Sequence, residues 1–474
     1  MLSKRLALVV AAALLATTAC GVAPDDGGFE VDEGQAVLTP SDQAMIDLAA
    51  KATKSLYANV DGRAPKELAA ALIAAAKRGV DAHVIVTVNS HDTTWLLQQR
   101  LEASGLDVDV RAASPVKGVL LIADGTALVP DTSGGTKLTK TAKTVTSFIT
   151  KFSAVFTTVH PKSAALLGSG VAILPMPDSA HDRIVQVLDA ARTSIDLEIY
   201  QLQERDVIGA LKDAAARGVR VRVMLEPKTV GSQNFGAAFA ELQAAHVDVK
   251  KTPATYDSHQ NVDHAKFCIV DGKELLFGTG NMVRSGLGGV TEGPYGNRDF
   301  WVEDARAASV KKAQALFDAD YAEKTSSSID FGDTVVTPDN AVESITGLVD
   351  SAKKRLLVYN QSLDDADLVG RLIAAKKRGV DVRVLLGYQP SFGGPSKTGD
   401  SLNALKAAGV QASFLKSHYL HGKSIVADDR VYVGSQNFTN GGLRNNREFG
   451  EILDDPAVVK TVVTTFTSDM ANPG

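Results

Sequence analysis

The sequence predicts an α/β protein that is built from three related modules. In each module an Ala/Leu-rich segment ends in Arg-Gly-Val and an apolar strand follows at once, at residues 78–86, 217–223 and 378–384. A glycine at the end of a helix can take the left-handed conformation that stops it. A helix joined so closely to a strand, and repeated along the chain, is typical of α/β layering. We expect modules over residues 41–165, 176–325 and 338–474.

The second and third modules repeat one polar motif. Each contains a histidine, a lysine two residues later, an aspartate, a glycine with a hydroxyl residue and an asparagine, and then an Asn-Arg-acid-Phe run. On a strand, residues two apart point to the same face, so the histidine and the lysine of each copy can face one phosphate. The copies consist of His264, Lys266, Asp271, Thr279, Asn281 and Asp299, and of His421, Lys423, Asp428, Ser435, Asn437 and Glu448.

The doubled motif resembles the HxKxxxxD signature of the phospholipase D superfamily, and the resemblance covers residues 176–470. It implies an α/β fold of phospholipase D-like α-β-α sandwich modules, with two catalytic halves in a pseudo-twofold arrangement and a degenerate N-terminal third module. It also implies one active site between the two halves of a single chain. We therefore expect a monomer.

The doubled motif supplies the groups that metal-free phosphodiester chemistry needs. Such chemistry calls for a neutral nucleophile, cations around the phosphate oxygens and a proton donor. One imidazole can attack phosphorus and form a phosphohistidine, while the other protonates the departing alcohol. The resemblance implies His264 as the nucleophile and His421 as the general acid and base. Lys266 and Lys423 would face the phosphate oxygens.

The other residues of the motif are expected to support this chemistry. Asn281 and Asn437 would donate amide hydrogen bonds to the phosphate. Asp299 and Glu448 could accept a hydrogen bond from an imidazole and hold its tautomer. The hydroxyl groups that could add donors to the phosphate are those of Thr279 and Ser435. The residues that we interpret as structural turns or ion-pair partners are Asp271 and Asp428.

A metal site is the competing interpretation of these histidines and carboxylates. Each motif histidine is followed by a lysine, and a cation beside a metal ligand is unfavourable. We therefore expect no metal and no other cofactor.

The first module has lost the polar groups of the motif. Its stretch 117–124 keeps the apolar strand and ends in Asp124, but Lys117 and Val119 stand where the histidine and the lysine should be. No Gly-x-x-Asn run follows in the sequence. We expect a structural or membrane-docking role for this module.

Residues 1–20 have the form of a secretory signal. Two basic residues precede an apolar stretch over residues 6–16, which is too short to span a membrane, and small residues precede Cys20. Cys20 resembles the lipidated cysteine of bacterial lipoproteins, although Thr17 stands where the lipobox leucine is expected. The acidic residues 21–40 indicate a tether. We expect an exported protein of the bacterial cell envelope, membrane-anchored through Cys20 and otherwise secreted.

Composition bears on the identity of the phosphodiester substrate. The formal net charge is −5 and the chain has two tryptophans, whereas a nuclease is expected to have a basic groove with stacking aromatics. Export and an anchor favour a phospholipid membrane surface, and nucleic acid is not favoured. The main hypothesis is a phospholipase D that hydrolyses phospholipid headgroup esters to phosphatidic acid and an alcohol. The alternatives are transphosphatidylation or cardiolipin-type synthesis, an exported metal-independent nuclease, and a non-catalytic phosphate-binding surface protein.

Overall fold

The computed structural model describes most of the chain from residue 38 to residue 473. The described part has gaps at residues 89–93, 95–96, 99, 103, 105, 112–113, 115, 134, 157–169, 178–179, 228–234, 254–261, 289–295 and 389–396. The expected leader over residues 1–20, the expected lipidation site Cys20 and most of the expected tether lie outside the described residues. None of the helices within these bounds is both long and apolar enough to cross a membrane.

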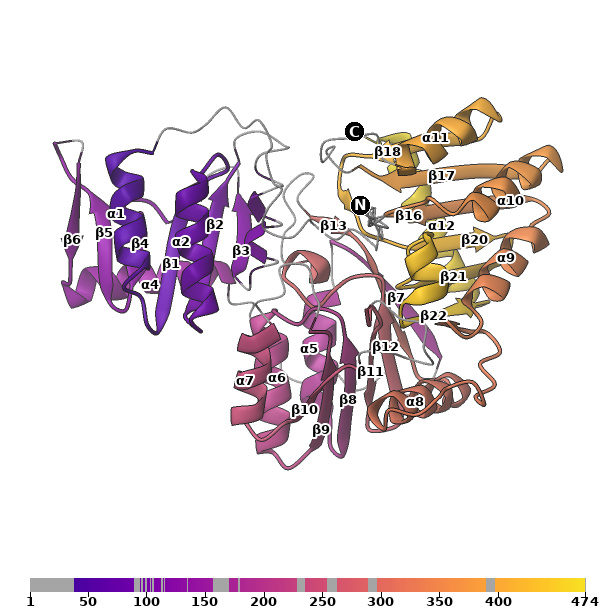
Figure 1. The fold of residues 1–474 in the computed structure, drawn as a ribbon, viewed down its shortest axis with the longest axis horizontal. Coiled ribbons are helices and arrows are strands. Elements are labelled where there is room, and N and C mark those ends of the chain that lie inside the picture. The colour runs from indigo at the N-terminus through magenta and orange to yellow at the C-terminus, as the bar shows by residue number, and fades with distance from the viewer. Residues whose placement is uncertain are drawn as a thin grey trace, which may run out of the picture.

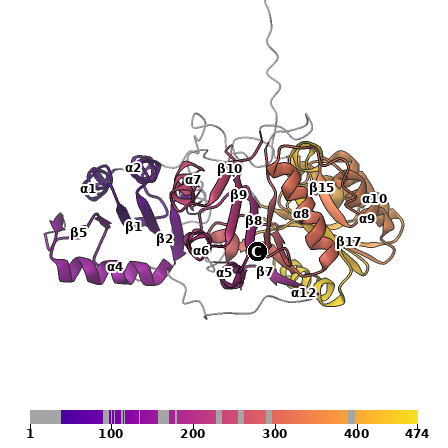
Figure 2. The same cartoon turned by 90° about the horizontal axis from the view of Figure 1, so that it is seen from below.

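The first module is a six-stranded sheet in the order β3-β2-β1-β4-β5-β6 (Figure 1). The strands β1 to β3 pair in parallel, and β4 to β6 continue the sheet in antiparallel pairs. Figure 2 shows α1 and α2 on one face and α4 on the other. The elements are α1 (Pro40–Ala49), β1 (Ser55–Asp61), α2 (Lys66–Lys77), β2 (Asp81–Thr87), β3 (Asp107–Arg111), β4 (Leu121–Ala123), β5 (Thr126–Pro130), β6 (Thr136–Thr139) and α4 (Ala142–Phe156).

The second module, called half 1 below, repeats this order with one more strand, as β10-β9-β8-β11-β12-β14-β7. Its elements are β7 (Val171–Pro175), α5 (Ala180–Ala190), β8 (Ser194–Ile199), α6 (Arg205–Ala216), β9 (Arg220–Leu225), α7 (Phe235–Ala244), β10 (Asp248–Lys251), β11 (Lys266–Val270), β12 (Glu274–Gly278), η1 (Ser285–Leu287), β13 (Asn297–Arg298), β14 (Phe300–Asp304) and α8 (Ala307–Tyr321).

The third module, called half 2, has the matching order β18-β17-β16-β20-β21-β22-β15. This agreement in strand order, with helices packed on the sheets, confirms the predicted α/β fold class of three modules. The elements are β15 (Thr334–Thr337), α9 (Ala341–Ser351), β16 (Arg355–Asn360), α10 (Ala366–Lys377), β17 (Asp381–Gly387), α11 (Lys397–Ala407), β18 (Gln411–Leu415), β19 (Tyr419–Leu420), β20 (Ser424–Ala427), β21 (Arg430–Gly434), η3 (Gly441–Asn445), β22 (Glu448–Leu453) and α12 (Pro456–Ala471).

One apolar core joins the two halves. The rings of Phe267 on β11 and Phe449 on β22 stack with centroids 4.6 Å apart, and Phe300 on β14 lies 5.6 Å from Tyr359 on β16. All four side chains are completely buried. Aromatic side chains bury about 150–250 Å² each, so this contact is a large part of what holds the sheets together. The shared core also fixes where the polar motifs meet.

The aspartate that ends each motif strand fixes a turn in all three modules. Asp124, Asp271 and Asp428 have φ values of 45°, 55° and 55°, in the left-handed region. The Asp271 carboxylate accepts hydrogen bonds from the Thr193 and Ser194 N–H groups at 2.7 and 3.0 Å. Asp124 and Asp428 make the same contacts at the starts of β1 and β16. In this structure the three carboxylates bind backbone at strand starts and not the motif histidines.

Replacing Asp271 by alanine tests this assignment. Asp271→Ala should destabilise the fold by about 2 kcal/mol, because several N–H groups lose a charged acceptor. Asp271→Asn should cost less, since asparagine keeps an acceptor and tolerates a positive φ. Urea unfolding measures the stability, and turnover per folded molecule should stay unchanged. Lost turnover at unchanged stability would instead give Asp271 a part in the chemistry.

Candidate active site

The two motif histidines meet where half 1 contacts half 2, and each is paired with a carboxyl group of the other half. His264 Nδ1 lies 2.8 Å from Glu448 Oε2, and His421 Nδ1 lies 3.0 Å from Asp299 Oδ1. Both carboxyl side chains are fully buried, and the histidine side chains are 5% and 10% exposed. A hydrogen bond at Nδ1 orients the ring and leaves Nε2 for a substrate. Neither half therefore supplies both the motif histidine and its carboxyl partner by itself.

Backbone hydrogen bonds between the halves place both histidines. β13 pairs with β19 in parallel, and Asp263 forms a matching bridge with Arg447. The His264 N–H donates to the Arg447 carbonyl at 2.7 Å, and the His421 N–H donates to the Arg298 carbonyl at 3.2 Å. Each histidine is thus held by the Asn-Arg-acid-Phe run of the opposite half.

The arginines of these runs lock the two halves with buried ion pairs. Arg298 Nε lies 2.7 Å from Asp469 of α12, and Arg447 Nη2 lies 3.0 Å from Asp320 of α8. In both cases the aspartate belongs to the other half. Sequence reasoning assigned no role to these arginines, although their repetition in both copies of the run was the available signal.

The asparagine that opens each run supports the acid two residues later. Asn297 Nδ2 donates to Asp299 at 3.1 Å, and Asn446 Nδ2 donates to Glu448 at 2.9 Å. These donors fix the carboxyl planes against the imidazoles. Each four-residue run therefore contributes four groups to the contact between the halves. These are the asparagine amide, the arginine side chain, the arginine carbonyl and the carboxyl group.

The motif lysines are completely buried beside the histidines. Lys266 Nζ donates to the His264 carbonyl at 2.6 Å, and its ammonium lies 5.1 Å from the centre of the Tyr200 ring. Lys423 Nζ donates to the His421 carbonyl and to Gln361 Oε1, the latter at 3.1 Å. Two buried cations next to two imidazoles make the site attractive to an anion.

The motif hydroxyls contact the acid-bearing strands. Thr279 Oγ1 donates to Asp299 at 2.6 Å and accepts from the Phe300 N–H, and Ser435 Oγ accepts from the Phe449 N–H at 3.0 Å. These contacts tie both hydroxyls to the strands that carry Asp299 and Glu448. A contact from either hydroxyl to phosphate stays a prediction.

The two asparagines that follow the hydroxyls were expected to bind the phosphate. Asn437 is completely buried. Asn281 is half-buried, and its Nδ2 donates to Gln201 Oε1 at 2.7 Å. A contact from either one to phosphate stays a prediction.

Burial and the lysines keep both imidazoles neutral. Burial, together with Lys266, Lys423 and His421, holds the pKa of His264 well below its usual value. Burial and Lys423 lower the pKa of His421 to about 4, although Asp299 opposes the shift. A neutral imidazole has the lone pair that attack on phosphorus requires.

The pKa values of the two partner carboxyls shift in opposite directions. Burial alone would raise the pKa of Asp299, but His421 and Lys423 outweigh it and the pKa falls below its usual value. Burial dominates at Glu448 and raises its pKa to about 8. The environment of Asp299 thus favours the ionised form, whereas that of Glu448 favours the protonated form.

The first module braces the segment that follows Asn281. Ser285 Oγ of η1 donates to Glu102 at 2.8 Å, and Arg284 Nη2 donates to the Val155 carbonyl at 2.8 Å. A Cβ at Gly286 would lie 2.4 Å from the Asn281 carbonyl, so η1 packs directly on the backbone of this motif residue. The module without catalytic groups thus contacts the neighbourhood of the site.

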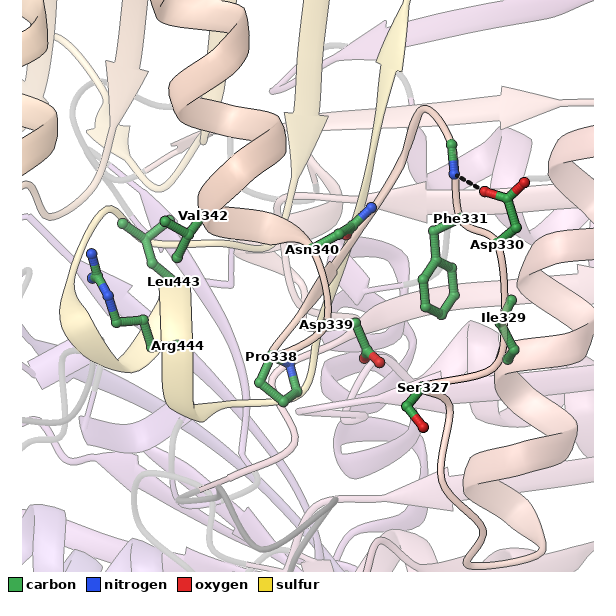
Figure 3. Close-up of a pocket in the computed structure, with 11 residues that line it drawn as sticks. Ser327, Ile329, Asp330, Phe331, Pro338, Asp339, Asn340, Val342, Leu443 and Arg444 are labelled. Carbon is green, nitrogen blue, oxygen red and sulfur yellow. Dashed lines mark hydrogen bonds between the residues drawn. The ribbon is translucent and has the colours of Figure 1, made fainter.

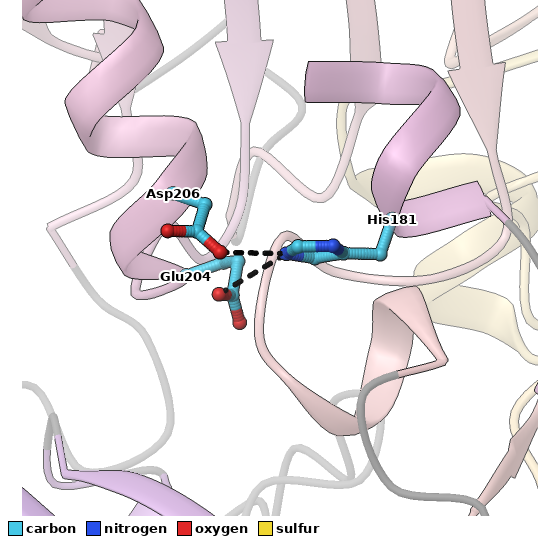
Figure 4. A group of neighbouring side chains, drawn as sticks. All are labelled: His181, Glu204 and Asp206. Carbon is cyan, nitrogen blue, oxygen red and sulfur yellow. Dashed lines mark hydrogen bonds and ion pairs between the residues drawn. The ribbon is translucent and has the colours of Figure 1, made fainter. Parts of the chain in front are cut away.

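A second polar cluster lies in half 1, where His181 points between Glu204 and Asp206 (Figure 4). Its Nε2 lies 3.3 and 3.4 Å from these carboxylates, and Nδ1 lies 3.1 Å from Asp182. The ligand atoms are close enough for a metal ion. Burial lowers the pKa of His181, but the carboxylates outweigh it and raise it to about 9. We interpret the cluster as an ion-paired imidazolium, with Arg284 as a further nearby cation.

A cavity of about 620 Å³ lies between η3 and the linker that joins the halves. Figure 3 shows Leu443 and Arg444 of η3 on one side of it and Ile329 and Phe331 of the linker on the other. None of the motif histidines or lysines lines it. The cavity offers no acid–base pair for phosphodiester chemistry, so we place the candidate site at the histidines.

Comparison with known proteins agrees with this geometry. A family model described as "Cardiolipin synthase, PLD-like domain" matches residues 184–321 and 345–470, which cover both halves. The chain belongs to this family. It is thereby a member of the phospholipase D superfamily, as the doubled motif predicts.

The curated relatives that match more than 300 residues of this family member are cardiolipin synthases, whereas the phospholipase D of Rickettsia prowazekii matches over 102 residues at 32% identity. The cardiolipin synthase of Halalkalibacterium halodurans is 24% identical over 330 residues, which cover 60% of this chain and 63% of the relative. The major cardiolipin synthase of Bacillus subtilis is 26% identical over 327 residues, which cover 61% and 66%. The chain thus spans about two thirds of the length of these relatives.

Among solved structures, the polyphosphate kinase of Porphyromonas gingivalis has a TM-score of 0.50 and 16% identity. The match covers 66% of this chain and 51% of the kinase. At this identity the likeness concerns the fold alone.

These comparisons overturn the main functional hypothesis. The sequence hypothesis was hydrolysis of phospholipids to phosphatidic acid, but the matching family model and relatives carry the names of synthases. They agree with the transferase alternative. The error has a chemical reason, because hydrolysis and transfer share a covalent intermediate and differ only in the acceptor.

The ion pair between Arg298 and Asp469 is testable by a double-mutant cycle. Arg298→Met should destabilise the protein by about 3–5 kcal/mol, because Asp469 stays buried without its cation. The double variant Arg298→Met/Asp469→Leu should regain most of that loss. Thermal unfolding measures the stability of the single and the double variant. Equal destabilisation by the single and double variants would show that the pair does not join the halves.

Proposed function

We propose that the chain is a phosphatidyl transferase of the cardiolipin synthase type. It would move the phosphatidyl group of one phospholipid to a headgroup hydroxyl of a second phospholipid. The observation that carries the proposal is the family match over both halves, together with two histidine–lysine pairs at one junction. The relatives' names supply the reaction class.

The proposed reaction has two displacements at phosphorus. In the first, one imidazole Nε2 attacks, a P–N bond forms, and the P–O bond to the donor headgroup breaks. The other imidazole gives its Nε2 proton to that oxygen and takes a proton at Nδ1 from its carboxyl partner. In the second, the same imidazole takes the proton of the acceptor hydroxyl at Nε2 and returns the Nδ1 proton to the carboxylate. The acceptor oxygen attacks phosphorus and the P–N bond breaks. The enzyme returns to its starting state, and no metal takes part.

The buried cations stabilise the charge that develops on the phosphate. Lys266 and Lys423 would contact the non-bridging oxygens, with Asn281 and Asn437 as amide donors. Preorganised donors in a site closed to water contribute more than they would in solvent. The near-complete burial of both imidazoles supports transfer, because water has little access to the phosphohistidine.

The charges of the two carboxyls favour an order of roles opposite to the one that the resemblance implies. Ionised Asp299 accepts the Nδ1–H of His421 and leaves a lone pair on Nε2, which suits the nucleophile. Protonated Glu448 donates to Nδ1 of His264 and leaves Nε2–H, which suits the general acid. We propose His421 as the attacking imidazole and His264 as the proton donor.

Isosteric substitution of the two acids tests this order. Asp299→Asn would place an amide donor at Nδ1 of His421 and remove the Nε2 lone pair, so turnover should fall at least about 1,000-fold. Glu448→Gln keeps a donor at Nδ1 of His264 but has no proton to pass on, so turnover should fall about 100-fold or more. Quenched reactions with mass spectrometry should locate the phosphate on His421. A phosphate on His264 would reverse the order.

The same proposal predicts the pH dependence of kcat/KM. The rate should fall below pH 4 as His421 gains a proton, and should fall above pH 8 as Glu448 loses its proton. Glu448→Gln should remove the alkaline limb while Asp271→Asn, the control, keeps both limbs. An unchanged alkaline limb in Glu448→Gln would contradict the assignment.

Product analysis tests the reaction class. With phosphatidylglycerol vesicles and EDTA, the protein should form cardiolipin and release glycerol. His264→Asn and His421→Asn should each lower the rate at least about 1,000-fold. Phosphatidic acid without cardiolipin would refute transfer. Cleavage of single-stranded DNA without any lipid product would identify a nuclease.

A further inference from the structure

The end of the first module lies in a stretch of the chain that contains no acidic residue. The protein has 55 Asp and Glu in 474 residues, yet none occurs between Asp131 and Asp178. The same stretch contains five lysines, four of them in the described residues. Such separation of charge stands out in a chain whose net charge is −5.

The structure places these lysines on β6 and α4. Lys137 on β6 pairs with Val129, which belongs to the core beneath α4, so Lys137 lies on the α4 face of the sheet. Lys140 follows β6, and Lys143 and Lys151 lie on α4; all four lysines are exposed. We call these four residues the lysine surface. Figure 1 shows β6 as the outermost strand of the first module, on the side away from the two halves.

α4 turns its apolar side inward and its lysines outward. Val145 and Phe152 are buried against the sheet, whereas Lys143 and Lys151 are exposed. Figure 2 shows the helix along the outside of the module. Asp131 borders the surface close to Lys137 and is the acid nearest to it in the sequence.

Protection of an edge strand is a simpler account of part of this pattern. A lysine on an exposed edge strand prevents pairing with other chains, and β6 is the edge of its sheet. That account covers Lys137. It does not cover the lysines of α4, which lie on a helix and not on a sheet edge.

We propose that the lysine surface docks the protein on an anionic phospholipid membrane. A lysine near such a surface contributes about 1 kcal/mol, or about fivefold in binding. The net charge of the whole chain is repelled by the same membrane. Binding therefore has to come from a local patch, and charge complementarity selects anionic lipid as the partner.

The lysine surface lies in the module that the expected tether enters. Leu38 begins the described chain, and an anchor at Cys20 would lie within roughly 60 Å of it at full extension. Docking would hold the first module, which braces η1, against the lipid that the proposed function uses. The inference concerns binding, and it rests on the proposed function only for the choice of phosphatidylglycerol as the lipid.

Sedimentation with vesicles tests the docking. The chain from residue 21 onward keeps every described residue and should bind vesicles of phosphatidylcholine with phosphatidylglycerol. Pure phosphatidylcholine vesicles should bind it weakly. The triple variant Lys137→Gln/Lys140→Gln/Lys143→Gln should bind about 100-fold more weakly. Added salt should weaken vesicle binding by the unmodified protein toward the level of the triple variant.

A matched control separates local from total charge. Lys353→Gln/Lys377→Gln/Lys406→Gln removes three exposed lysines of half 2 and should change binding less than about threefold. Equal losses in the two triple variants, or no binding to phosphatidylglycerol vesicles, would refute the docking surface. Equal binding of the unmodified chain to duplex DNA, lost in the Lys137 triple variant, would also refute it and indicate nucleic acid.

Turnover in detergent micelles separates docking from chemistry. The Lys137 triple variant should form product in mixed micelles within about twofold of the unmodified rate, because the histidine site is untouched, and should be slow on vesicles. Vesicle binding without any lipid product would contradict the proposed function and leave the docking intact. Equal loss in micelles and vesicles would show that the lysines act on the site and not on the membrane.

Discussion

The exchange of acids between the halves is the constraint on which the rest of the site depends. His264 takes its carboxyl from half 2 and His421 takes its carboxyl from half 1. The same two runs supply the carbonyls that fix both histidine backbones and the arginines that bind α8 and α12 of the opposite half. A shift between the halves would therefore disturb both imidazoles at once. The buried aromatic contact of Phe267 with Phe449 prevents such a shift.

The near-symmetry of the two pairs is broken by charge. Asp299 and Glu448 occupy matching positions, yet the hydrogen bond with His421 and the charge of Lys423 lower the pKa of the first, while burial raises the pKa of the second. Two environments thus give one acid–base division of labour, as pairs of titratable groups often do. Transfer needs this division in both steps, because the same imidazole must first give and then take a proton.

The first module shows which parts of the repeat serve structure. It keeps the sheet order and the Asp124 turn but has no histidine or lysine at the motif positions. Its remaining contacts lie at two ends. One end braces the segment after Asn281 through Glu102 and Val155, and the other presents the lysine surface.

The sequence by itself determined the three-module fold, because glycine helix stops and apolar strands are local signals that recur. It also determined which residue types meet, since the polar motif is repeated. Only the tertiary structure decided that each acid serves the other half's histidine, and that Thr279 and Ser435 support the acid strands. The histidine–carboxyl partners lie about 120–180 residues apart in the sequence, so their pairing depends on how the halves pack and cannot be read from local residue spacing. Neither the sequence motif nor the arrangement of the site decides between water and an alcohol as acceptor, because hydrolysis and transfer use the same catalytic groups.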